Sequence, residues 1–225
     1  MKKLLIFVML IALSNVVFAQ KDVTKFLGIP VDGTKEEMIQ ELKAKGFRSS
    51  SHDREVLEGE FNGTKVTLHV VTNKNKVYRI MVADKIPRNE PSIKIRFNTL
   101  CKQFNNNPNY ISFDDYEIPE NEDISYEITA HHKRYEAAFY QKPDVTDSLM
   151  IKNMVRDAML SRYAGYVVEN PTEDAMDKIQ SDVYKMYIDR ISYKSVWFMI
   201  SELYGEYYIA MYYDNKYNEA NGEDL

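Results

Sequence analysis

Apolar and polar residues alternate along this chain with two periods, one typical of helices and one typical of strands. Residues 34–47 show the helical period, with an apolar stripe formed by Met38, Ile39 and Leu42. Thr34 followed by Glu37 forms a capping box, which satisfies free backbone amides at a helix start. Gly46 is placed to end the helix in the left-handed conformation, with Phe47 folding back on the last turn. These signals predict a capped helix.

Three strand-like runs follow this helix. Residues 55–61 lead into Asn62-Gly63, the strongest two-residue signal for a hairpin turn. Residues 66–70 alternate apolar and polar positions, residues 73–75 turn the chain again, and residues 77–82 form the third run. The spacing predicts consecutive antiparallel strands.

The middle of the chain returns to the helical period. Pro91 opens a predicted helix whose apolar face continues to Phe104, and residues 105–108 end it. A polar, acidic loop follows. Residues 124–140 are then predicted to form a hairpin that turns near His131-His132-Lys133.

Two more helices and a last hairpin complete the pattern. Residues 147–163 and 173–191 have helical spacing, and Thr172 is placed as an N-cap. Residues 195–214 are predicted to form a hairpin that turns at Tyr204-Gly205.

Helices followed by sequential hairpins favour an antiparallel sheet with helices on one face. The predicted fold class is therefore α+β, with helix-then-hairpin repeated. We expect one domain over residues 20–217 and a flexible polar tail over residues 218–225. One domain is preferred because the sequence shows no linker, and two similar halves that share a sheet are the alternative.

The N-terminus has the three parts of a cleavable secretory signal peptide. Lys2 and Lys3 are positive, residues 4–13 are apolar, and Val17-Phe18-Ala19 suits a signal peptidase. The apolar run is shorter than the roughly 20 residues that a membrane-spanning helix needs. We therefore predict a signal peptide over residues 1–19, removed by cleavage after Ala19. Gln20 rather than a cysteine would begin the mature chain, so we expect a periplasmic or secreted protein that is not a lipoprotein.

Charge narrows the choice of partners. The net charge is −5, and loss of Lys2 and Lys3 with the signal peptide makes the mature chain more acidic. Nucleic acids and anionic lipids both attract clustered lysine and arginine. We therefore expect no nucleic-acid partner and no membrane insertion after signal cleavage.

Cysteine and histidine offer little chemistry. Cys101 is the single cysteine, so no intramolecular disulfide forms and the fold must rest on packing. It shares an apolar helix face with Phe97 and Phe104, which predicts a buried, inert thiol. His131 and His132 are neighbours in a predicted hairpin, where adjacent side chains point to opposite faces and rarely bind one metal.

Carboxylates crowd one loop, at Asp114, Asp115, Glu117, Glu120, Glu122 and Asp123. A glycosidase needs two carboxylates fixed across a cleft, and a calcium loop needs ligands at set offsets. Neither pattern is present, so the loop is interpreted as solvated, and calcium binding by residues 114–123 stays an open alternative. The motifs HExxH, GxSxG and CxxC, a phosphate-binding glycine loop and a dinucleotide fingerprint are also absent from the sequence. We predict no catalytic residues, no metal and no cofactor.

Aromatic residues concentrate in the last hairpin. The predicted binding residues are Trp197, Tyr207, Tyr208, Tyr212 and Tyr213. Strand alternation puts Tyr208 and Tyr212 on one face and Tyr207 and Tyr213 on the other. Tyrosine and tryptophan are enriched where proteins bind partners. Ordinary strand packing is the other explanation, because aromatic residues favour sheets.

Three stretches carry a resemblance to known proteins. "GIPVDGTKEEM" within residues 26–47, "IKIRFNTLCKQF" and "YGEYYIAMYYDN" resemble exported proteins of unknown function from gut anaerobes. The capped helix followed by glycine-turned hairpins distantly resembles the beta-lactamase-inhibitor-protein-like fold. That resemblance implies a curved antiparallel sheet with helices on one face and the other face offered to a protein, and it supplies no catalytic residues.

These observations predict an exported, non-enzymatic binding or scaffolding module that uses an open sheet face to bind a protein or peptide. Two alternatives remain. One is a glycan-binding protein that uses the same aromatic residues as stacking platforms, and the other is an unrecognised hydrolase that uses the acidic loop.

Overall fold

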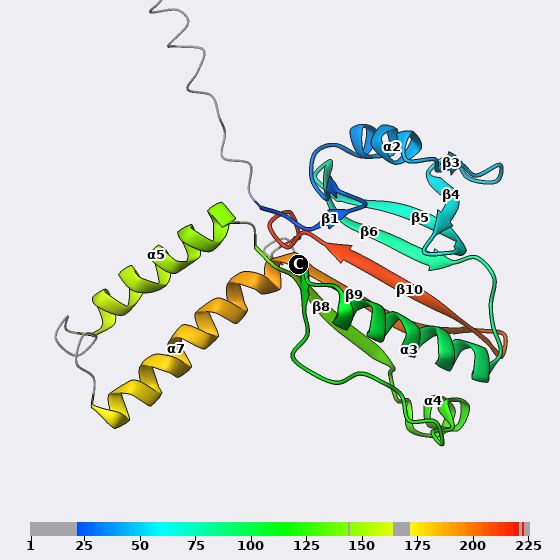
Figure 1. Cartoon of the computed structure of the whole chain (residues 1–225). Helices are drawn as coiled ribbons and strands as arrows, with labels where there is room; N and C mark the ends of the chain where they lie inside the picture. The colour runs from blue at the N-terminus through cyan, green and yellow to red at the C-terminus, as the bar shows by residue number, and fades with distance from the viewer. Residues whose placement is uncertain (1–21, 144, 164–171, 221, 223–225) are drawn as a thin grey trace, which may run out of the picture.

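The computed structural model describes residues 22–143, 145–163, 172–220 and 222 (Figure 1). The predicted signal peptide, its cleavage site and half of the predicted tail lie outside these residues. In chain order the described elements are β1 (Lys25–Phe26), β2 (Ile29–Pro30), α2 (Lys35–Ala44), β3 (Arg48–Ser49), β4 (Val56–Phe61), β5 (Thr64–Asn73), β6 (Lys76–Asp84), α3 (Glu90–Asn106), β7 (Tyr110–Ile111), α4 (Ile124–His131), β8 (Glu136–Gln141), α5 (Val145–Arg162), α7 (Glu173–Ile191), the 3-10 turn η1 (Ser192–Lys194), β9 (Ser195–Leu203) and β10 (Glu206–Asp214).

One antiparallel sheet of eight strands organises the fold, in the order β3-β4-β5-β6-β10-β9-β8-β7. Strands β3–β6 follow helix α2, and strands β7–β10 follow helix α3. The last strand of each set lies at the centre, where Tyr212 is opposite Met81 and Asp214 is opposite Arg79. The strand order is therefore symmetric about the β6–β10 pair, and the predicted α+β class with an antiparallel sheet is confirmed.

Helix α2 has the caps that the sequence predicts. The Thr34 side chain accepts a hydrogen bond from the Glu37 backbone, and the Glu37 carboxylate accepts one from the Thr34 backbone at 2.9 Å. At the other end Gly46 has φ +102°, and the Phe47 N–H donates to the Leu42 carbonyl at 3.2 Å. This left-handed ending turns Phe47 back toward the core.

The predicted hairpin turns are also confirmed. Asn62 and Gly63 have φ values of 49° and 68°, and Tyr204 and Gly205 have 53° and 79°. Two consecutive residues at positive φ form the tight turn whose twist matches that of paired strands. Lys74 and Asn75, with φ values of 49° and 62°, make the third such turn, between β5 and β6.

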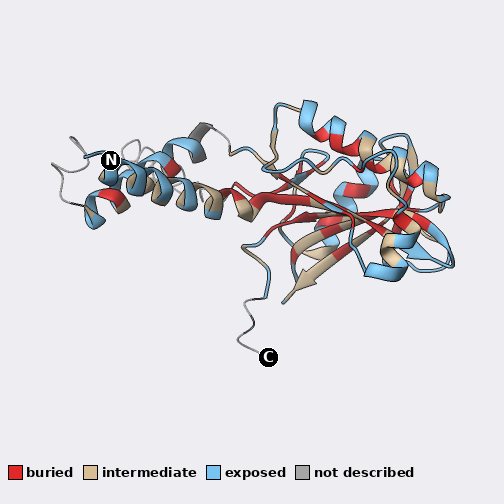
Figure 2. Cartoon of the chain, turned by 90° about the horizontal axis from the view of Figure 1, so that it is seen from below, coloured by how far each residue is buried: buried red, intermediate tan, exposed pale blue. Residues whose placement is uncertain are grey.

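The hydrophobic core lies between one face of the sheet and helices α2 and α3, as Figure 2 shows. The predicted apolar face of α3 is buried, at Ile93, Phe97, Leu100, Cys101 and Phe104. Full burial of each large apolar side chain contributes roughly 1.5–3 kcal/mol. None of the helices in the described ranges is long and apolar enough to cross a membrane.

The hairpin predicted over residues 124–140 is wrong. Residues Ile124–His131 form helix α4, with the Asp123 side chain accepting from the Tyr126 N–H at 2.8 Å as an N-cap. Strand β8 pairs with β7 and β9 and not with residues 124–131. Ile124 and Ile128 are four residues apart, so this short run satisfies the helical period as well as the strand period.

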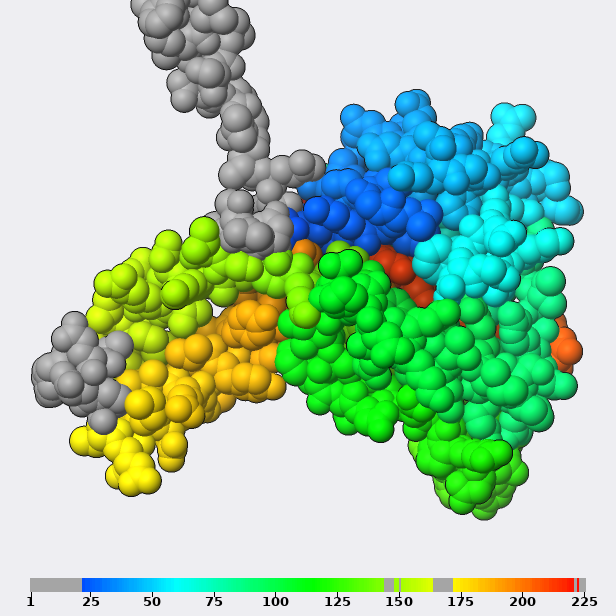
Figure 3. All heavy atoms as spheres, in the orientation of Figure 1, coloured from blue at the N-terminus to red at the C-terminus, as the bar shows by residue number. Residues whose placement is uncertain are grey.

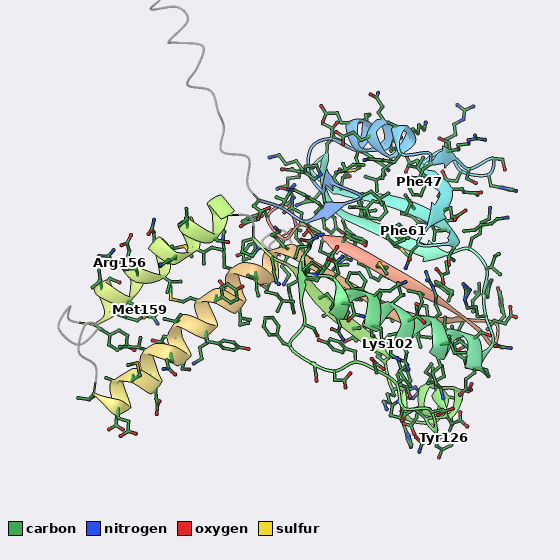
Figure 4. The ribbon with its side chains drawn as sticks, in the orientation of Figure 1. Phe47, Phe61, Lys102, Tyr126, Arg156 and Met159 are labelled. Atoms are coloured by element: carbon green, nitrogen blue, oxygen red, sulfur yellow. The ribbon has the colours of Figure 1, made fainter. Side chains whose placement is uncertain are left out.

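Helices α5 and α7 lie beside each other beyond one end of the sheet rather than on its face (Figure 1). Between them Ile151 and Met159 are buried, and Figure 4 shows Met159 pointing toward α7 and Arg156 pointing away. The Tyr163 hydroxyl donates to Asp182 at 3.0 Å. Helices on one sheet face are therefore an accurate description of α2 and α3 but not of this pair.

A close approach at Gly59 gives a test of the core. Figure 4 shows Phe47 between α2 and strand β4, and a Cβ atom at Gly59 would lie 2.4 Å from the Phe47 Cδ1. Because Phe47 is 3% exposed, Gly59→Ala is expected to lower the free energy of unfolding by about 1–3 kcal/mol. Urea unfolding followed by the fluorescence of Trp197, the single tryptophan, measures this loss. Glu60→Ala, at the next and exposed position, is the control, and equal stability of both variants would contradict the prediction.

Candidate functional site

The face of the sheet opposite α2 and α3 carries half-buried apolar side chains from its central strands. Alternate residues of β5, β6, β10, β9 and β8 point to this open face, and its larger apolar members are Val71, Met81, Tyr208, Tyr212, Trp197, Met199 and Tyr140. The register places Tyr212 between Trp197 and Met81. These side chains are intermediate in exposure, unlike the core residues behind them.

Trp197 and Tyr212 form an aromatic platform at the centre of this face. Their ring centroids are 4.1 Å apart and their planes differ by 20°. The guanidinium carbon of Arg79 lies 5.0 Å from the Tyr212 ring centroid and 5.6 Å from that of Trp197. Two ring faces that stack across neighbouring strands stand upright on the sheet, so the rings present their edges to a partner.

The Asp214 carboxylate holds the aromatic platform in place. Arg79 Nε donates to Asp214 Oδ1 at 2.6 Å and Arg79 Nη2 donates to Oδ2 at 2.8 Å. Trp197 Nε1 donates to the same Oδ2 at 2.8 Å. The hydrogen bonds with Asp214 raise the pKa of Arg79. Paired in this way, the guanidinium and the indole have little rotamer freedom left to lose on binding.

The face continues beyond the aromatic platform toward the edge of the sheet. Tyr208 lies four residues before Tyr212 on the same side of β10, opposite Ser201. Tyr140 packs against Phe113 with ring centroids 5.3 Å apart. Beside Trp197 a hollow of about 350 Å³ is lined by Tyr116, Arg134, Glu136, Ala137 and Ala138. The open face therefore combines fixed aromatic rings with a small recess.

The predicted binding residues divide between the two faces as alternation requires. Tyr208, Tyr212 and Trp197 lie on the open face, whereas Tyr207 and Tyr213 are 6% and 5% exposed and lie on the helix side. The Tyr207 hydroxyl donates to Ser125 Oγ at 2.9 Å. We therefore leave Tyr207 and Tyr213 out of the open-face site.

Sequence reasoning missed Arg79 and Asp214. Arg79 stands within an otherwise apolar strand run, and Asp214 ends the tyrosine-rich strand. A charged residue in or at the end of an apolar strand was the only sign in the sequence that these two positions are special. The sequence contains nothing that pairs two residues 135 positions apart, because their contact depends on the central pairing of β6 with β10.

The acidic loop uses its carboxylates locally. The Glu122 carboxylate accepts from the Tyr135 hydroxyl at 2.6 Å and pairs with Lys133, and these contacts lower the pKa of Glu122. Asp123 caps α4, and Asp114 accepts from the Asp115 backbone N–H at 2.9 Å. Within the described ranges, no three histidine, cysteine or acidic residues are grouped so that they could hold a metal ion.

The remaining sequence candidates lie in ordinary structural positions. His131 bonds to Glu127 at 2.9 Å, and His132 ends α4 with φ 53°, so the pair closes a helix and does not lie in a hairpin. Cys101 is 0% exposed, which confirms the predicted burial. Burial raises the pKa of Cys101 to about 12. Its thiol therefore stays protonated at neutral pH and is a poor nucleophile.

Removal of the central carboxylate tests how the aromatic platform is held. Asp214→Ala leaves the Arg79 charge and the Trp197 N–H without their acceptor, and is expected to lower the free energy of unfolding by about 2–4 kcal/mol. Chemical denaturation measured by Trp197 emission also reports the changed surroundings of the indole. Glu206→Ala, at the exposed start of the same strand, should change stability by less than about 0.5 kcal/mol. A stable Asp214→Ala protein with unaltered emission would show that the carboxylate is dispensable.

Comparison with protein-family models, with curated proteins and with solved structures finds no match to this chain. The resemblances noted from the sequence stay predictions.

Proposed function

We propose that this protein is an exported, non-enzymatic binding module whose open sheet face docks a protein or peptide partner. The observation that supports this proposal is the aromatic platform of Trp197 and Tyr212, fixed by Arg79 and Asp214 on a face that no described helix covers.

The composition of the open face suits a protein partner. Tryptophan, tyrosine and arginine are the residue types that dominate binding energy at protein interfaces, and methionine is enriched there. Trp197, Tyr212 and Arg79 meet at the centre of the face. Met81 lies opposite Tyr212, and Met199 lies two residues beyond Trp197 on the same side of β9, opposite Ala210. Charged residues such as Arg134 and Glu136, which pair at 2.9 Å, lie toward its edge. An apolar centre with a polar rim is the usual plan of a protein interface.

The shape of the face favours a protein segment over a sugar ring. Stacking of a sugar needs an accessible aromatic face, whereas Trp197 and Tyr212 turn their faces toward each other. The hollow of about 350 Å³ beside Trp197 has room for a single side chain of a partner. Ring edges next to a side-chain-sized recess match the way interface anchors are received.

Substitution of the two outward tyrosines tests the proposed surface. The protein is purified after expression of the complete coding sequence, immobilised, and exposed to cell-envelope extract, with captured proteins identified by mass spectrometry. The double variant Tyr208→Ala/Tyr212→Ala is expected to bind the captured partner about 30- to 1,000-fold more weakly in calorimetric titration, because truncation of two interface aromatics removes about 2–4 kcal/mol.

Tyr204→Ala is the matched control, since Tyr204 is 96% exposed at the tip of the same hairpin and off the face. This control should bind as the parent does. Unchanged affinity in the double variant, with its fold verified by circular dichroism, would exclude the open face as the binding surface.

Export has its own test. The protein recovered from the envelope fraction of the expressing cell should begin at Gln20, as read by intact mass and N-terminal sequencing. Recovery of a chain that retains residues 1–19 would contradict both the predicted cleavage and a periplasmic or secreted location.

A further inference from the structure

A second hollow lies on the helix-bearing side of the sheet. Figure 3 shows β10, in red, at the bottom of a gap between the N-terminal segment, in blue, and α3, in green. The groove has a volume of about 810 Å³, within the range of roughly 300–1,000 Å³ that small-ligand sites occupy. Leu100, Phe104, Met211 and Tyr213 contribute buried surface to it.

The Tyr213 hydroxyl is the polar group at the bottom of this groove. Tyr213 is 5% exposed, and burial raises its pKa well above the ordinary value. No described residue donates to this hydroxyl or accepts from it. The described residues also contain no fully enclosed side-chain polar atom that lacks a partner, so the hydroxyl is open to the groove that Tyr213 lines. A hydroxyl that has no protein partner and opens to a groove takes its hydrogen bonds from whatever occupies that groove.

Tyr110 and Gln141 form one wall. Gln141 Oε1 accepts from the Lys25 backbone N–H at 2.8 Å, and Gln141 Nε2 donates to the Lys25 carbonyl at 2.7 Å and to the Tyr110 hydroxyl at 3.1 Å. The Tyr110 hydroxyl therefore accepts one hydrogen bond and keeps its own proton to donate. The two bonds to the Lys25 backbone attach Gln141 to the N-terminal segment and so fix the wall of the groove that Tyr110 and Gln141 form.

Neutral amides form the opposite rim. Asn62 Nδ2 donates to Gln103 Oε1 at 2.7 Å, so the Asn62 carbonyl oxygen and the Gln103 amino group are not used in that bond, and both residues line the groove. Asn107 and Asn109 add further amides. Each side-chain amide offers both donors and an acceptor.

Charge in the groove is largely neutralised. Lys194 and Asp22 form a buried pair at 2.6 Å, with side chains 7% and 3% exposed, and Lys194 also donates to the Lys142 carbonyl at 3.0 Å. Of the two carboxylates that line the groove, Asp22 is thus occupied and Glu60 is exposed at the rim. Lys25 and Lys142 also line the groove and are exposed, so apart from the Lys194–Asp22 pair its charged groups lie at the rim. From this we infer that the bottom of the groove suits a neutral ligand.

We propose that this groove binds a neutral oligosaccharide. Sugar hydroxyls both donate and accept, and so match the amides and the two tyrosine hydroxyls. The apolar faces of sugar rings match the rings of Phe61 and Tyr110, which line the groove and are half-buried. This site is separate from the open face proposed above, because Tyr212 and Tyr213 point to opposite sides of β10.

Removal of the Tyr213 hydroxyl alone tests the proposal. The protein from the complete coding sequence is screened by ligand-observed NMR against neutral oligosaccharides of glucose, mannose, galactose, xylose and N-acetylglucosamine, with a pentapeptide mixture as comparison. For an oligosaccharide that binds the parent, Tyr213→Phe is expected to weaken affinity roughly 10-fold. Its Tm should be unchanged or higher, because the variant loses no hydrogen bond within the described protein.

Tyr207→Phe is the matched control, since Tyr207 is equally buried on the same strand but its hydroxyl bonds to Ser125. It should lower the Tm by about 2–4 °C and leave oligosaccharide affinity unchanged. Gln103→Ala, at an exposed position, should weaken binding without loss of stability. The proposal is wrong if no oligosaccharide in the panel binds, if only peptides bind, or if Tyr213→Phe keeps the parent affinity. Loss of protein capture by Tyr208→Ala/Tyr212→Ala with oligosaccharide binding intact would distinguish the two sites.

Discussion

The Asp214 carboxylate is a charged group that lies almost out of solvent at the end of the central strand, 7% exposed. Such a group must be paired and hydrogen-bonded, and Arg79 of β6 and Trp197 of β9 supply three hydrogen bonds. Because these two strands flank β10, satisfying one carboxylate fixes the register on both sides of the sheet centre. The Asp214 backbone carbonyl also accepts from the Thr24 hydroxyl, which attaches the N-terminal segment to the same point.

The contacts of Asp214 fix strand β10, and β10 contributes to two different surfaces, the open face and the groove. Side chains of a strand alternate between faces, so Tyr212 joins the aromatic platform while Tyr213 lies at the bottom of the groove. The N-terminal segment that walls the groove is held by buried polar contacts, including Asn215 Nδ2 donating to the Val31 carbonyl at 2.7 Å. Asn218 donates to Asp32 at 2.7 Å, so the chain is still anchored at the start of the predicted tail.

Local signals were sufficient for much of the fold. The Thr34–Glu37 box, the Asn62-Gly63 turn and the Tyr204-Gly205 turn each depend on residues within a few positions of one another, and all three form as predicted. The sequence could not reveal which strands are neighbours across the sheet, because that depends on contacts between distant residues. The Arg79–Asp214 pair could not be predicted either, because its two residues are 135 positions apart in the sequence. The pairing of β8 with β9 could not be predicted for the same reason. Because this partner was unknown, residues 124–140 were interpreted as a local hairpin.

The two surfaces differ in what they offer a ligand. The open face presents ring edges and a single small recess, which suits a large partner that covers area. The groove brings neutral donors and acceptors around a recessed volume, which suits a ligand smaller than a protein partner. Asp214 and Thr24 support both surfaces, whereas Tyr212 and Tyr213 each belong to one. Changes at the shared anchors should therefore disturb both kinds of recognition together, and changes at the two tyrosines should separate them. On strand β10, the residue that positions both surfaces, Asp214, can thus be distinguished by mutation from the residues that contact a ligand, Tyr212 and Tyr213.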